Sequence, residues 1–201
     1  MYQYRDLSRI TRVATITLWV YMSLQLLFGF FDYLQNVSRL PSLNATNFGA
    51  AEFAGLFSFI ALVVAVIIVG RWIYRASANA HTIAPDLTIR PGWAVGWYFV
   101  PFANLIKPFQ AMKETWLASH YGINWQAHTA PGRLRTWWAL WIITNIIGNI
   151  AFRTADKAPE ASAICSLVQG VIEIPLSLIL IRIMREISRE QNATRNEGVF
   201  A

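Results

Sequence analysis

Five polar side chains share one helix face of the last apolar run, residues 161–181. They are Ser162, Ser166, Gln169, Glu173 and Ser177, spaced four, three, four and four residues apart. Glu173 lies near the middle of the run, where an ionisable group is costly in a membrane and by default marks a functional site. A carboxyl at this depth could relay protons or hold a cation.

Two asparagines would reach a similar depth from other segments. Asn145 lies inside the apolar run 136–152, and Asn104 lies in the segment before it. A candidate midplane polar site therefore consists of Asn104, Asn145, Gln169 and Glu173. The alternative is that these side chains only hold helices together, since hydrogen bonds between membrane helices contribute about 0.6 kcal/mol each on average.

Motifs for other chemistry are missing from the sequence. The single cysteine, Cys165, excludes a disulfide scaffold, and the three histidines share no metal-ligand spacing. No nucleophile lies in a catalytic motif, and no glycine-rich phosphate loop is present. We therefore predict that the protein is not an enzyme and binds no cofactor and no metal.

The elements that carry these residues are long and apolar. The chain has 201 residues, of which 55% are hydrophobic and 14% charged, against about 25% charged in soluble domains. Four apolar runs cover residues 13–34, 53–70, 136–152 and 161–181, and a hydrocarbon core about 30 Å thick needs about 20 helical residues. We predict an all-α polytopic membrane protein with four transmembrane helices in a single integral domain, residues 1–201.

Positive charges predict how the chain is threaded. A fifth apolar stretch, residues 93–106, is short for a span. If it does not cross, 14 of the 17 lysines and arginines lie on one side, and only Arg39, Arg153 and Lys157 lie on the other. If it crosses, the split is eight against nine. The positive-inside rule therefore favours four spans in the cytoplasmic membrane, with both termini cytoplasmic.

The segment between spans two and three, residues 92–119, is rich in tryptophan, which prefers the head-group layer. We expect Pro85 to end the preceding helix, Asn104 to cap the next one, and Pro108 to lie in its first turn. The segment is either a re-entrant hairpin packed between the spans or an interfacial amphipathic helix. The last helix is expected to leave the membrane and end near Gln191.

One stretch of this region resembles a known family, the domain of unknown function 4328 family. The resemblance covers about residues 50–190. The residues that carry it are Trp72, Arg75, Asn79, Gly92, Trp93, Gly96, Trp97, Pro101, Asn104, Pro108 and Trp116. Arg90 and Ile106 depart from the family pattern. The resemblance implies a bacterial multi-pass membrane protein with no assigned activity.

Three classes of function are compatible with this sequence to different degrees. The first is a non-enzymatic membrane scaffold or interaction protein. The second is a small transporter or channel that uses the site around Glu173, and the third, an intramembrane enzyme, lacks supporting motifs. The expected partners are the lipid bilayer, anionic lipid head groups, and a protein partner or a second copy. Nucleic acid is not expected, because the basic residues are dispersed along membrane boundaries.

Overall fold

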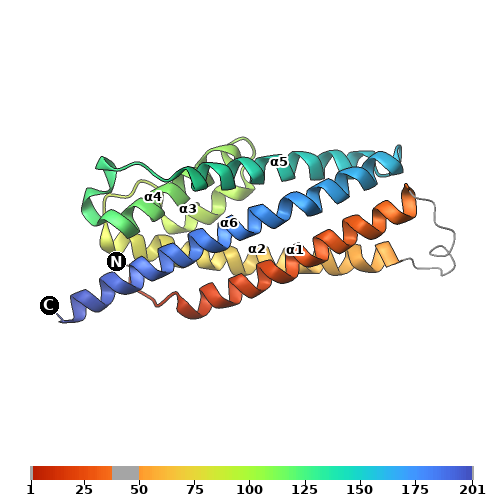
Figure 1. The fold of residues 1–201 in the computed structure, drawn as a ribbon. Coiled ribbons are helices and arrows are strands. Elements are labelled where there is room, and N and C mark those ends of the chain that lie inside the picture. The colour runs from red at the N-terminus through yellow and green to blue at the C-terminus, as the bar shows by residue number, and fades with distance from the viewer. Residues whose placement is uncertain (1, 38–49, 201) are drawn as a thin grey trace. The chain divides into compact units, whose positions relative to one another are not determined.

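The computed structural model describes residues 2–37 and 50–200, which form helices joined by short turns (Figure 1). The helices are α1 (Ser8–Asn36), α2 (Ala50–Ile83), α3 (Pro91–Gly96), α4 (Lys107–Tyr121), α5 (Gly132–Thr154) and α6 (Pro159–Phe200), with 3-10 turns at Trp97–Phe99, Ala103–Leu105 and Gly122–Ala127. No strand occurs within these described residues. The predicted all-α class is confirmed.

Each of the four predicted apolar runs lies inside one long helix. Three helices are long and apolar enough to cross a membrane, Ser8–Asn36, Glu52–Ile83 and Pro159–Arg195. Helix α5 contains the third run, residues 136–152, but is not among these three, because Arg133, Arg135 and Arg153 flank a short apolar stretch. The count of four spans stays a prediction. Arg39, which the charge count assigns to the far side, lies outside the described residues.

The chain divides into two compact units. Unit 1 comprises Met1–Thr15, Val66–Trp138 and Leu180–Ala201, and unit 2 comprises Ile16–Ala65 and Ala139–Ile179. Helices α1, α2, α5 and α6 each contribute one segment to each unit. The single domain expected from the sequence stays a prediction.

Within unit 1, α3 and α4 form a hairpin (Figure 1). Prolines set its limits: α2 ends at Ile83, two residues before Pro85, and Pro91 and Pro108 lie in the first turns of α3 and α4. A proline has no amide hydrogen to donate and fits best in the first turn of a helix, where that hydrogen has no helical partner. The expected helix limits at Pro85 and Pro108 are confirmed.

The tip of this hairpin differs from the expectation. The residue that caps α4 is Ile106, without a side-chain hydrogen bond, and Asn104 lies in the 3-10 turn before it. The backbone N–H of Asn104 donates to the carbonyl of Val100 at 2.9 Å, so the chain reverses direction here. The prediction that Asn104 caps the helix was wrong because this reversal takes up residues 101–106.

Helix α6 also continues beyond the expected end. Gln191 and Asn192 make tertiary hydrogen bonds to α2, α4 and the segment before α1. These bonds hold the helix past Gln191, and it ends at Phe200. The expected end near Gln191 was wrong, because sequence periodicity cannot show that side chains beyond the apolar run have partners.

Candidate functional site

The centre of unit 2 is a pair of buried polar side chains. Glu173 of α6 is 7% exposed, and its Oε1 accepts a hydrogen bond from the hydroxyl of Tyr21 on α1 at 3.2 Å. Tyr21 also packs against Ala61 and Ala65 of α2. The buried carboxyl thus has a phenol as its partner, and the phenol is packed in turn against two small side chains.

Other polar side chains of unit 2 are paired across helices in the same way. Ser58 of α2 donates to Gln25 of α1 at 2.7 Å, and both are buried. Ser162 of α6 donates to the carbonyl of Ala151 in α5 at 2.9 Å. Such bonds link α1 to α2 and α5 to α6, as interhelical glue would.

Close backbone contact joins α1 to α6 in this unit. A Cβ atom added to Gly29 would lie 2.6 Å from the carbonyl oxygen of Ser166, and one added to Gly170 would lie 3.0 Å from that of Gln25. The first distance excludes a side chain unless the helices move apart, and the second is tighter than most real contacts of a Cβ atom. These two glycines allow the helices to approach closely enough for the Tyr21–Glu173 bond.

The four predicted site residues have different surroundings. Gln169 lies one turn before Glu173 on α6, and its amide faces Gly148 of α5. Asn145 is exposed and donates to the carbonyl of Trp141 in its own helix at 2.7 Å. Asn104 is half-buried and belongs to unit 1. Within unit 2, Glu173 is therefore joined by Tyr21, which the sequence reasoning did not select.

Two signals in the sequence could have identified this partner. Tyr21 and Gln25 lie four residues apart in the first apolar run, so they share a helix face. Pro175 lies inside α6, two residues after Glu173. Because proline cannot donate an N–H, the carbonyl four residues earlier, at Val171, loses its helical partner close to Glu173. In a membrane helix such a freed carbonyl needs a partner from a neighbouring helix, a Ser or Thr side chain or water, so the proline indicates a side of α6 that faces another helix.

Unit 1 contains a second buried polar centre, between α2, α4 and α6. Gln191, which is completely buried, donates to the carbonyl of Ala76 at 2.9 Å and to the hydroxyl of Ser119 at 2.8 Å, and accepts from Asn79 at 3.0 Å. Asn79 is itself paired with the backbone of Arg5: it accepts from the N–H at 2.9 Å and donates to the carbonyl at 2.8 Å. The centre thus ties three helices to the segment before α1.

Several residues that carry the family resemblance make contacts within unit 1. Trp72 is completely buried and donates to Thr11 of α1 at 2.8 Å. Trp93 stacks on Trp97 with ring centres 4.5 Å apart. Trp116 donates to Glu186 of α6 at 3.4 Å, and Glu186 also binds Arg133 at 2.5 Å. The remaining positions are Arg75, half-buried on α2, and Gly92, Gly96, Pro101 and Pro108 of the hairpin.

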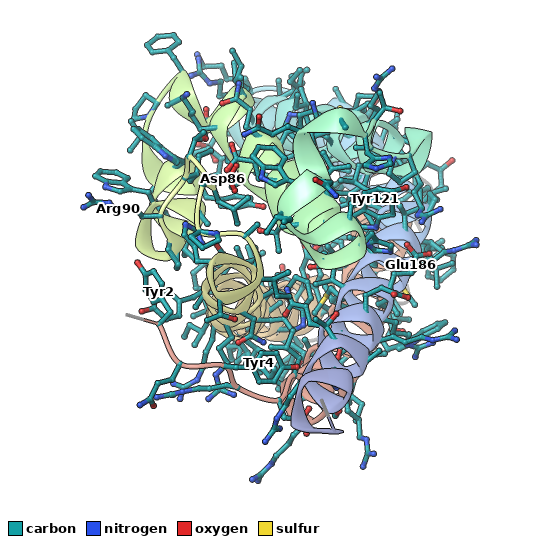
Figure 2. All side chains as sticks on the ribbon, turned by 90° about the vertical axis from the view of Figure 1, so that its left-hand side faces the viewer. Tyr2, Tyr4, Asp86, Arg90, Tyr121 and Glu186 are labelled. Atoms are coloured by element: carbon teal, nitrogen blue, oxygen red, sulfur yellow. The ribbon has the colours of Figure 1, made fainter. Side chains whose placement is uncertain are left out.

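One end of unit 1 faces the viewer in Figure 2, where Glu186 lies on α6 and Tyr121 at the end of α4. Asp86 follows α2 and accepts from Trp125 at 3.0 Å. Across the described ranges 2–37 and 50–200, no three His, Cys, Asp or Glu side chains lie together as metal ligands would.

Comparison with known proteins gives a family and no close relative. A family model described as "Domain of unknown function (DUF4328)" matches residues 41–189, well over half of the chain. Neither the curated proteins nor the solved structures contain a match.

Proposed function

Because this chain belongs to the family of the domain of unknown function DUF4328, whose description assigns no activity, we propose a role from its surfaces and its interior. The protein is a multi-pass protein of the cytoplasmic membrane. It acts as a non-enzymatic scaffold or interaction protein, with lipid around its apolar helices and its basic face toward the cytosol.

The observation that carries this proposal is the apolar surface of α2. Only 17% of its most apolar 18-residue window is buried, against 39% in α1 and α6. Phe57, Phe59 and Ile67 are each more than half exposed. Burying apolar surface is favourable by about 25 cal/mol per Å², and soluble proteins rarely leave contiguous apolar patches larger than a few hundred Å² in water. Lipid chains supply the cover that the protein does not.

The threading follows from the distribution of charge. Four helices cross, with α5 as the fourth, and the arginines and lysines concentrate on the cytoplasmic side. Both termini are then cytoplasmic. The basic residues near the membrane surface attract anionic lipid head groups, each by about 1 kcal/mol.

The tip of the α3–α4 hairpin enters the lipid from this side. Its apolar side chains are turned outward: Phe99 is 70% exposed and Phe102 85%, and Leu105 and Ile106 are also exposed. Lys107 follows directly and is exposed. Its long apolar stem lets the ammonium group reach the head groups while the tip lies deeper.

Polar contacts in unit 2 support a scaffold over a transporter. The buried groups Tyr21, Glu173, Gln25 and Ser58 satisfy one another in pairs, as expected for a packed interior. A transporter or channel is the second candidate, and the buried carboxyl of Glu173 is the observation that favours it, since such groups mark ion and proton pathways.

Membrane embedding and threading are tested together in a chain with Cys165→Ala. Single cysteines at positions 90, 104, 125 and 157 are labelled with a membrane-impermeant maleimide from each side. We expect 90 and 125 to label from the cytosol, 157 from the far side, and 104 slowly from the cytosol. Release of the chain by alkaline carbonate, or labelling of 125 from outside, would contradict the proposal.

A further inference from the structure

The segment before α1, residues 2–7, is held on unit 1 by side chains, and we call it the strap. Its partners, which we call the strap surface, are Asn79 and His81 of α2 and Asn192 and Arg195 of α6. In Figure 2 the strap passes Tyr2 beside α2 and continues past Tyr4 toward α1.

Backbone recognition anchors the strap. Asn79 bonds both the N–H and the carbonyl of Arg5, at 2.9 and 2.8 Å. This paired contact depends on an extended backbone and not on the side chain that the backbone carries, as in the main-chain hydrogen bonds by which proteins bind extended peptides. Gln191 accepts from the same amide of Asn79 and so fixes its orientation.

Side-chain contacts add selectivity on either side of this anchor. Tyr4 donates to Asn192 at 2.6 Å and lies under the guanidinium of Arg195, 5.4 Å from the ring centre. Asp6 accepts from Asn192 at 3.1 Å. Leu7 is completely buried. Tyr2 lies against His81 with ring centres 5.5 Å apart.

We propose that the strap surface is a binding site for an extended peptide segment of a partner protein, and that residues 2–7 occupy it in cis. The segment it fits carries a tyrosine, an acidic residue two positions later and a leucine at the third, the pattern of Tyr4, Asp6 and Leu7. Main-chain pairing supplies affinity and these three side chains supply selectivity. The inference rests on the proposed interaction role and names the chemistry of the partner.

The strap competes with any partner for the strap surface. The apparent affinity for the partner therefore equals the intrinsic affinity multiplied by the fraction of molecules in which the surface is free. The probe is a fluorescent peptide of residues 2–9 with blocked ends, added to the full chain in detergent and followed by anisotropy. The test chain has residues 2–6 replaced by glycine and serine. We expect it to bind the peptide at least about tenfold more tightly than the unmodified chain.

Two further chain variants and two altered peptides test this result. Asn79→Leu in the test chain removes two hydrogen bonds and should weaken binding about tenfold or more. Replacement of tyrosine by alanine at the peptide position that corresponds to Tyr4 should also weaken it, and a scrambled peptide reports adsorption to detergent. Adding Leu7→Ala to the test chain should raise affinity further, and helix content by circular dichroism checks that each chain folds.

Equal binding to the unmodified and test chains, or equal binding with and without Asn79→Leu, overturns the proposal. A dimer of the unmodified chain that disappears in the test chain would assign the surface to a second copy and overturn the partner assignment. The proposed membrane role fails separately, because extraction of the chain by carbonate is independent of the peptide assay.

Discussion

Gly29 and Gly170 mark two points at which α1 and α6 touch backbone to backbone, and each lies opposite main-chain atoms of the other helix. A Cβ atom at Gly29 would meet the carbonyl of Ser166 at 2.6 Å, and one at Gly170 would meet that of Gln25 at 3.0 Å. Small residues at membrane helix interfaces permit such approach, which strengthens van der Waals packing.

Gly29→Ala should therefore destabilise the protein by about 1–3 kcal/mol, the usual cost of overpacking. Unfolding in increasing sodium dodecyl sulfate, followed by circular dichroism, measures the change. Gly148→Ala is the matched control, because the atoms its Cβ would meet belong to the side chain of Gln169, which can move. Equal effects of the two variants would show that the close approach of α1 and α6 makes no special contribution to stability.

The Tyr21–Glu173 bond gives a second prediction. Glu173→Gln keeps an acceptor for the hydroxyl of Tyr21 and should leave stability nearly unchanged. Glu173→Leu leaves that buried hydroxyl without its partner and should cost about 1–3 kcal/mol. Unfolding in detergent distinguishes the two. A transport role predicts another pattern, in which both variants abolish the cellular phenotype while the protein remains folded and abundant.

The buried side-chain amides of unit 1, Gln191 and Asn79, give a third prediction. Gln191→Met removes the donor to Ala76 and Ser119 and the acceptor for Asn79. Several buried groups then lose partners, so we expect a loss of at least about 2 kcal/mol and faster hydrogen exchange in the strap. Gln126→Met, at an exposed position, is the control. Similar unfolding curves for the two variants would contradict a structural role for the centre.

Asp6 makes the start of α1, and the strap that leads into it, sensitive to acid. The backbone N–H of Ser8, and then its side chain, hold the pKa of Asp6 below its ordinary value of 3.8. The contribution of the ionised carboxylate to the free energy of unfolding is therefore present above about pH 4 and is lost as the pH falls through the lowered pKa. Hydrogen exchange at Arg5 should accelerate in that range. Asp6→Asn should remove the acid dependence, and if the acceleration persists, another group is responsible.

Phe102 at the hairpin tip allows a prediction in which stability and membrane contact change in opposite directions. Its φ of 62° is a conformation that side chains disfavour by about 1–2 kcal/mol and that glycine adopts freely. Phe102→Gly should therefore stabilise the protein in detergent but reduce quenching of Trp93 and Trp97 by brominated lipid. Ile123→Ser, at another exposed apolar position, should not reduce it. Unchanged quenching in Phe102→Gly would contradict insertion of the tip.

The helices and their limits at prolines could be predicted from this sequence, because apolar runs and prolines act locally, and the family could be predicted from its motif. The side chains that pair across distant parts of the chain could not be predicted. Glu173 was predicted as a buried polar group, yet its partner Tyr21 lies 152 residues away. The side-chain centre of Asn79 and Gln191 was missed for the same reason, since its members are 112 residues apart. Polar pairing depends on which helix faces meet, and periodicity within one helix does not determine that.

The loop between α2 and α3 has a mechanical consequence for the hairpin. Glu114 of α4 accepts hydrogen bonds from the backbone N–H groups of Thr88 and Ile89, at 3.0 and 3.2 Å, and from the hydroxyl of Thr88. Because these bonds tie the loop to α4, the loop cannot act as a free hinge between α2 and the hairpin. We therefore expect the hairpin to move together with the end of α2.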